Sequence, residues 1–165
     1  MDQSKQHVVD FRSSLADGLI PLGDRSIPTE IHKAKFVELL ATNLRGKPRE
    51  WSEKNHTWTR YNVLTEILWY SRRPVSFTFR DDLLERVEVS TSDEATENWD
   101  YSVETQRYFA AKKIMVQSLG KESRSQETDT NMETVWDFGK QLVFVSCDAR
   151  TGGSAIGLRT NLQSD

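Results

Sequence analysis

The chain has 165 residues, which is the length of one domain and enough for one hydrophobic core. Apolar residues make up 36% and charged residues 28% of it, which is too apolar for a wholly disordered chain. With 22 basic and 25 acidic residues the net charge is −3, so no overall field draws the chain to nucleic acid or to an anionic membrane, and any polyanion site must be a local patch.

The sequence predicts an intracellular protein, cytoplasmic or nuclear, that does not insert into a membrane. Its single cysteine, Cys147, cannot form an internal disulfide. No apolar stretch approaches the roughly 18 residues of a membrane span, and residues 1–11 (MDQSKQHVVDF) lack the apolar centre of a signal peptide.

Three amphipathic helices are predicted in the first half of the chain. Apolar residues recur at spacings of three and four in residues 4–17, 29–46 and 59–73. Threonines at the start of the second and third segments can cap them, and Pro74 ends the third, because the residue before a proline is driven out of helical geometry.

From residue 75 the apolar period changes from about 3.6 to 2, which predicts strands. Residues 75–90 fit a hairpin with its turn at Asp81 and Asp82, in which Phe77 and Phe79 face the core. Further strands are predicted at 99–104, at 134–149 with a bulge at Gly139, and at 155–160.

Three other segments are less regular. The stripe of Tyr108, Ala111 and Met115 in residues 107–118 would suit a helix, but the aromatic and β-branched content favours a strand. The uniformly polar residues 120–131 predict a mobile loop, and residues 161–165 a frayed C-terminus.

Taken together, these patterns predict a single α+β domain over residues 1–165. Two or three N-terminal helices would pack on a mostly antiparallel sheet of about five or six strands.

Sequence motifs give no support for catalysis, a metal or a cofactor. The chain has no P-loop, no GxGxxG opening a helix and no GxSxG elbow. His7, His32, His56 and Cys147 do not have the spacing of a zinc site. The glycines of residues 151–154 (TGGS) predict a hairpin turn rather than an anion cradle.

A metal-dependent nuclease is the sharpest enzymatic alternative. Asp81, Asp82 and Glu88 lie around the predicted hairpin, where carboxylates could hold Mg²⁺. The stretch superficially resembles nucleases of the PD-(D/E)xK type, but Ser90 stands where those enzymes have their lysine. Two acidic residues after a strand are ordinarily a turn, so this alternative ranks last.

RNA binding through a local basic and aromatic patch is the second alternative. Several stretches mix cations that could contact phosphates with aromatic rings that could stack on bases. The candidate residues are Arg45, Lys47, Arg49, Trp51, Trp58, Arg60, Trp69, Arg72, Arg73, Arg107, Lys112 and Lys113.

A non-enzymatic protein that binds another protein is the first prediction, with self-association into a homo-oligomer as one form of it. Five Trp, four Tyr and seven Phe are many large rings for one modest core, and Trp and Tyr are enriched at protein interfaces. An uncovered face or edge of the sheet would supply the contact.

Overall fold

The computed structural model describes residues 12–67, 70–91, 100–150 and 153–160, and only the backbone of residues 70–73. A helical turn at residues 12–16 precedes the first strand. The elements that follow are β1 (Leu19–Leu22), β2 (Arg25–Pro28), α2 (Lys33–Leu40), β3 (Leu44–Glu53), β4 (His56–Ile67), β5 (Tyr70–Arg80), β6 (Leu83–Ser90), α3 (Tyr101–Leu119), β7 (Arg124–Glu127), β8 (Asn131–Asp137), β9 (Gln141–Asp148) and β10 (Gly153–Thr160).

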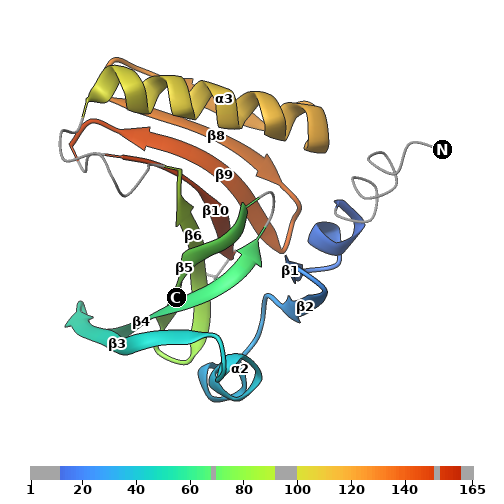
Figure 1. Ribbon diagram of the computed structural model, residues 1–165, viewed down its shortest axis with the longest axis vertical. Helices are drawn as coiled ribbons and strands as arrows, with labels where there is room; N and C mark the ends of the chain where they lie inside the picture. Colours follow the sequence, from blue (N-terminus) through green and yellow to red (C-terminus); the bar gives the residue numbers. More distant parts are fainter. Residues whose placement is uncertain (1–11, 68–69, 92–99, 151–152, 161–165) are drawn as a thin grey trace.

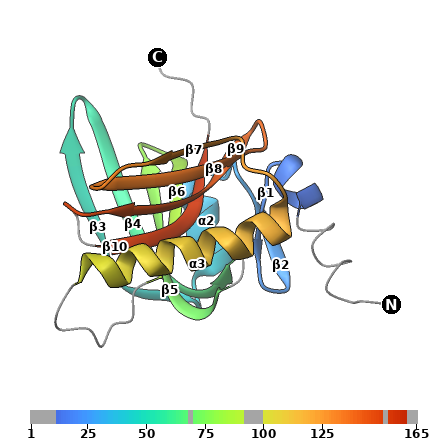
Figure 2. The same ribbon diagram turned by 90° about the horizontal axis from the view of Figure 1, so that it is seen from above.

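One large antiparallel sheet organises these elements, with the strand order β3-β4-β5-β6-β10-β9-β8-β7. Strands β1 and β2 form a separate two-stranded sheet. Helix α3 lies across β8, β9 and β10, and α2 lies at the opposite end of the molecule near β4 and β5 (Figures 1 and 2). The half formed by β3 to β6 is set at an angle to the half formed by β7 to β10 (Figure 1).

The predicted fold class is wrong in the number and placement of its parts. The large sheet has eight strands rather than five or six, a second small sheet is present, and the long helix α3 follows β6 instead of lying near the N-terminus. The antiparallel pairing and the mixed α+β character are confirmed.

The largest error concerns residues 59–73, which were predicted as a helix: residues 59–67 lie in β4 and residues 70–73 in β5, while residues 68 and 69 lie outside the described residues. Thr59, Val63 and Ile67 are the buried residues of β4, and their spacing of four imitates a helical stripe. Tyr61 and Thr65 between them are half-buried, so the true period of two is only partly visible in the sequence.

The opposite error occurs at residues 99–104 and 107–118, which were predicted as strands. Residues 101–119 form α3, while Trp99 lies outside the described residues. The buried side chains of α3 follow a helical spacing and are Glu104, Tyr108, Ala111, Met115 and Leu119. Asp100 caps the helix by accepting a hydrogen bond from the Ser102 amide at 2.8 Å.

Smaller corrections concern the ends of elements. Helix α2 is shorter than the predicted 29–46, because Thr29 does not cap it; its hydroxyl donates to the Gly18 carbonyl at 2.6 Å instead. The predicted long strand 134–149 is the hairpin β8–β9, with Gly139 in its turn at φ 85°. The predicted loop 120–131 contains β7, and residues 161–165 lie outside the described residues.

The core lies on the face of the sheet that α2 and α3 cover. Phe36 of α2 packs on Phe77 and Phe79, with ring centroids 4.9 and 5.0 Å away. Both rings of β5 are completely buried, so the prediction that they face the core is confirmed. On the α3 half, Tyr108 and Cys147 belong to the same buried cluster.

Candidate interaction surface on the polar sheet face

The other face of the large sheet carries polar side chains, and four arginines fall into one row across it. Antiparallel pairing sets Arg49 of β3 opposite Arg60 of β4, Arg60 opposite Thr78 of β5, Thr78 opposite Arg86 of β6, and Arg86 opposite Arg159 of β10. Directly paired residues of antiparallel strands point to the same side of a sheet. We call these four side chains the arginine row.

Two tryptophans flank one end of the arginine row. Trp51 of β3 and Trp58 of β4 are direct cross-strand partners, with ring centroids 6.3 Å apart and ring planes 8° from parallel. The guanidinium carbons of Arg49 and Arg60 lie 5.8 and 5.4 Å from the centroid of Trp51. The Trp58 indole N–H donates to Glu85 Oε2 at 2.9 Å. Both rings are half-buried and are held in place by these contacts; we call them the tryptophan pair.

At the other end of the row, two arginines cover a buried aromatic ring. Phe144 of β9 is completely buried although it lies on the polar face. The guanidinium carbons of Arg86 and Arg159 lie 4.7 and 5.0 Å from its centroid. Arg86 donates to Glu88 at 2.8 Å and Arg159 to Glu133 at 2.7 Å. The two carboxylates therefore orient the arginines that shield the ring from water.

The polar face has a mixed charge, with its positive excess near the tryptophan pair. Arg49, Arg60, Arg80, Arg86 and Arg159 lie on it, together with Glu53, Glu85, Glu88 and Glu133. Glu85, Glu88 and Glu133 are paired with arginines of the β5, β6 and β10 part of the face, whereas Glu53 lies opposite His56 in the β3–β4 hairpin. The β3–β4 hairpin adds Arg45 and Lys47, so a local excess of cations surrounds the tryptophan pair.

Six of the predicted nucleic-acid-binding residues come together on the β3–β4 hairpin, and three others lie on α3. The six are Arg45, Lys47, Arg49, Trp51, Trp58 and Arg60. Trp69 lies outside the described residues, and the side chains of Arg72 and Arg73 at the start of β5 are not described.

The three remaining candidates, Arg107, Lys112 and Lys113, belong to α3, which covers the opposite face of the sheet. Arg107 pairs with the buried Glu104 at 2.7 Å, and Lys112 with Glu127 at 2.5 Å. Although burial lowers the pKa of Lys112, its hydrogen bond to Glu127 and the neighbouring negative charges outweigh that effect and raise it. Arg107 and Lys112 therefore serve contacts within the chain, and none of the three cations extends the arginine row.

Sequence reasoning missed Arg80, Arg86 and Arg159 as members of the surface. Arg80 and Arg86 did alternate with apolar residues in the predicted hairpin, which was a signal that they share a face with Thr78. Nothing local to Arg159 could place it beside Arg86, because that neighbourhood depends on the pairing of β10 with β6.

The carboxylates of the nuclease alternative do not form one site. Asp81 Oδ2 lies 2.7 Å from His56 Nδ1, and Asp82 Oδ2 lies 2.7 Å from His32 Nδ1. Glu88 is on the polar face with Arg86. Among the described residues, no group of three or more His, Cys, Asp or Glu side chains is placed to hold a metal ion.

The two aspartates instead pin neighbouring segments to the β5–β6 turn. The Asp81 carboxylate accepts a hydrogen bond from the Thr57 amide at 3.0 Å. This bond is the largest cause of the lowered pKa of Asp81, and the hydrogen bond with His56 is the next largest. The His32 hydrogen bond, followed by the bond from the Lys33 amide, lowers the pKa of Asp82. One aspartate thus fixes the β3–β4 turn, and the other fixes the start of α2.

Cys147 is a buried core residue rather than a reactive group. It is free of any disulfide, and burial raises the pKa of its thiol, which disfavours the thiolate. In the predicted TGGS turn, Thr151 and Gly152 lie outside the described residues, while Ser154 is buried in β10.

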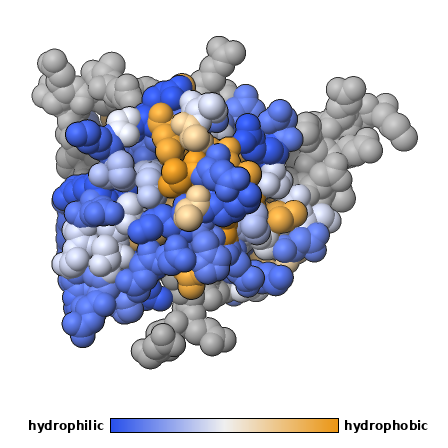
Figure 3. Space-filling view, turned by 90° about the horizontal axis from the view of Figure 1, so that it is seen from below, coloured by the Kyte–Doolittle hydropathy of each residue, from blue (hydrophilic) through white to orange (hydrophobic). Residues whose placement is uncertain are grey.

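The underside of the molecule carries a small apolar area bordered by hydrophilic residues (Figure 3). Helix α2 lies on this side (Figure 1), and its Leu39 is 40% exposed, as is Leu83 at 39%, which is bridged to the start of α2. Both leucines are more than half covered, so this area is a weaker candidate than the polar face. Within the described part of the chain, no helix has the length and apolar character needed to cross a membrane.

Comparisons with known proteins bear on the fold but not on the site. No protein family model matches the sequence, and no curated protein does. A solved structure of a DUF4309 family protein (YjgB) from Bacillus subtilis subsp. subtilis str. 168 aligns with 97% of this chain and 100% of that chain, with a TM-score of 0.52 and 15% sequence identity. At this identity the similarity shows the fold alone.

Proposed function

We propose that this protein binds an acidic segment of a partner protein through the polar face of its large sheet. The observation that carries the proposal is the tryptophan pair beside Arg49 and Arg60, which presents two ordered rings within a local excess of positive charge. Tryptophan and arginine are the residues that most often dominate the energy of protein interfaces. Electrostatic attraction would select a partner segment of negative charge.

The mixed charge of the polar face favours a protein partner over RNA. A polyanion lying along the whole arginine row would meet Glu85, Glu88 and Glu133, and each of these carboxylates would repel a phosphate. A folded protein carries both signs of charge and can place its own cations opposite these three. RNA binding restricted to the β3–β4 hairpin is the alternative outcome that the experiment below must separate.

Contact through the face is a better proposal than strand addition at the sheet edge. Strand β3 is the edge strand beside the tryptophan pair, and it carries Lys47 and Pro48 in a stretch where its register with β4 is interrupted. Proline lacks a backbone N–H, and a charged edge discourages pairing with another chain. We therefore place the partner across the tryptophan pair rather than alongside β3.

The test measures fluorescence anisotropy of a short glutamate-rich peptide, its lysine-rich counterpart and oligouridylate, each titrated with the protein at low and moderate salt. The wild-type protein should bind the glutamate-rich peptide, and the R49E/R60E variant should bind it at least about tenfold more weakly. The matched control, K113E/K121E, reverses two exposed lysines away from the polar face and should bind like the wild type.

Three results would contradict the proposal: no binding of the glutamate-rich peptide, equal binding by R49E/R60E, or tighter binding of oligouridylate. The last result would establish the RNA alternative. Light scattering on the same samples tests self-association, since an oligomer that dissociates in R49E/R60E would make a second copy the partner. An intracellular location is part of this proposal, because the only cysteine is buried and unpaired.

A further inference from the structure

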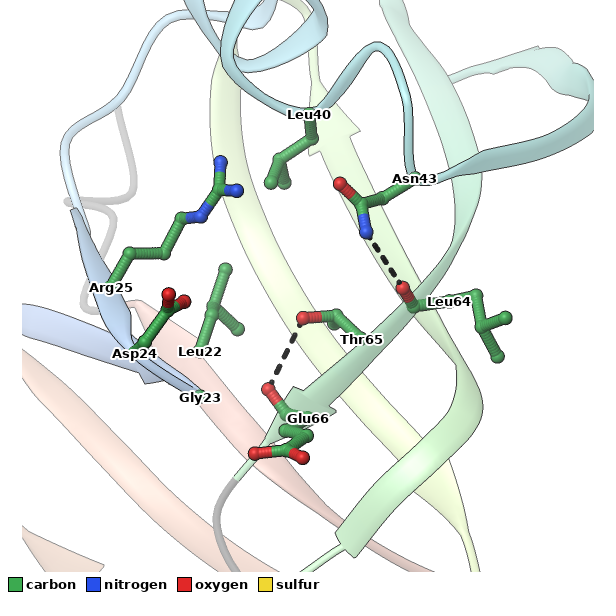
Figure 4. A pocket seen from close by; sticks show the side chains of 9 residues that line it. All are labelled: Leu22, Gly23, Asp24, Arg25, Leu40, Asn43, Leu64, Thr65 and Glu66. Carbon is green, nitrogen blue, oxygen red and sulfur yellow. Dashed lines mark hydrogen bonds between the residues drawn. The ribbon is translucent and has the colours of Figure 1, made fainter.

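A pocket of about 490 Å³ lies at the end of β4, and none of its lining residues belongs to the arginine row. It lies between the β1–β2 turn, the C-terminal end of α2 and the end of β4 (Figure 4). This volume falls within the range of small-molecule sites in proteins, about 300–1,000 Å³. The pocket is separate from the surface of the proposed function, and the inference below does not depend on that function.

Two side chains of opposite charge point into the pocket from neighbouring positions. Figure 4 shows the Asp24 carboxylate and the Arg25 guanidinium directed inward from the β1–β2 turn. No ion pair joins them. The Asp24 carboxylate has no hydrogen-bond partner among the described residues, so it can accept from a ligand.

Arg25 is held in position but keeps donors for a ligand. Its Nη1 donates to the Leu39 carbonyl at 3.1 Å, which ties the guanidinium to the last turn of α2. A guanidinium has about five N–H donors in a planar fork, and this fork suits the two oxygens of a carboxylate. The bond to Leu39 uses one donor and orients the others.

Apolar and uncharged polar groups complete the lining. Leu22 and Leu40 form a buried floor, with 2% and 1% of their surface exposed. The Thr65 hydroxyl lies at the side of the pocket, and the Asn43 amide donates to the Leu64 carbonyl at 3.1 Å. The site thus offers an apolar surface beside one anion and one cation.

We infer that this pocket binds a zwitterionic α-amino acid with an apolar side chain. The ligand's ammonium group would pair with Asp24, its carboxylate would take the free donors of Arg25, and its side chain would lie against Leu22 and Leu40. Asp24 and Arg25 are both exposed at the mouth of the pocket, and a zwitterion can contact both charges at once, whereas an isolated cation or anion contacts only one. The Glu66 carboxylate lies against Gly23 at the rim and adds negative charge on the ammonium side.

The test is calorimetric titration of the full chain with L-leucine, and then with two analogues that each lack one charge. N-acetyl-leucine has no ammonium group and leucinamide has no carboxylate. L-leucine should bind, and each analogue should bind at least about tenfold more weakly. D24N should weaken leucine binding by about tenfold and R25Q by at least as much, whereas E30Q, at an exposed residue outside the pocket, should leave it unchanged.

The ligand series keeps the inference falsifiable even if a variant fails to fold. Absence of leucine binding, or equal binding of leucine and both analogues, would overturn it. Unchanged binding by folded D24N and R25Q would place the leucine elsewhere and overturn it as well. Loss of binding in R49E/R60E would show that the ligand occupies the polar face instead.

Discussion

Gly157 of β10 lies so close to the neighbouring strands β6 and β9 that no side chain fits there, and this gives a sharp test of the sheet. A Cβ atom at Gly157 would lie 2.1 Å from the Val87 carbonyl oxygen, and 2.9 Å from both Glu88 Cα and the Phe144 ring. Two of these three neighbours are backbone atoms, so rotation of a side chain cannot relieve the clash. The G157A variant must separate β10 from β6 or lose their register.

Overpacking of this kind costs about 1–3 kcal/mol, and the backbone contact puts G157A at the upper end, about 3 kcal/mol. For a chain of this size each kcal/mol lowers the Tm by about 2–4 °C, so a decrease of about 6–12 °C is expected. Thermal unfolding followed by circular dichroism, together with urea unfolding, measures it. The control A155S adds one atom on the same strand and the same face, at a half-buried position, and should change stability by less than about 1 kcal/mol. A loss below about 0.5 kcal/mol in G157A would refute the close approach of β6 and β10.

Three further predictions concern the core and the turns. F36A removes the ring that packs on both aromatic residues of β5 and should cost about 3–5 kcal/mol in urea unfolding, whereas F36L should cost less. Y108F removes a buried hydroxyl that lies 2.6 Å from Thr134 and should cost about 1 kcal/mol by the same measurement. The pKa values of Asp81 and Asp82 are lowered by folding, so their contribution to stability is complete above the unfolded pKa of about 4 and is lost as the pH falls through the lower folded pKa. Urea unfolding at a series of pH values should therefore show a shallower loss of stability below about pH 4 in D81N/D82N than in the wild type; equal slopes would contradict the assignment.

Local patterns predicted the parts of the fold that local contacts determine. The β5–β6 hairpin was predicted correctly, because apolar and polar residues alternate over 75–80 and 86–90 and its turn is two residues long. Residues 59–73 were wrongly predicted as a helix and residues 107–118 wrongly as a strand. Both segments carry apolar side chains at spacings that fit either the helical or the strand period. The decisive factors were β4 pairing on both sides and the Asp100 cap of α3, neither of which the patterns revealed.

The candidate surface was only partly predictable for the same physical reason. The six hairpin residues are close in sequence, and the mixture of cations and tryptophans there drew attention to them. The arginine row depends on the register of five strands. One of these pairings joins Arg86 of β6 to Arg159 of β10, which are far apart in the sequence. A shift of one residue in any of these pairings would turn an arginine to the core face, so no single segment contains the information.

The contacts on the polar face also limit how a partner can bind. Phe144 is already buried beneath Arg86 and Arg159, so covering this end of the face would remove little apolar surface from water. It would instead desolvate ion pairs that are now partly hydrated, which costs free energy. The tryptophan pair is different, because both rings retain exposed surface and the nearby cations of β3 have no carboxylate partner on the face. The free energy of binding should therefore concentrate on the β3–β4 hairpin, as in a small, reversible interface rather than an obligate one.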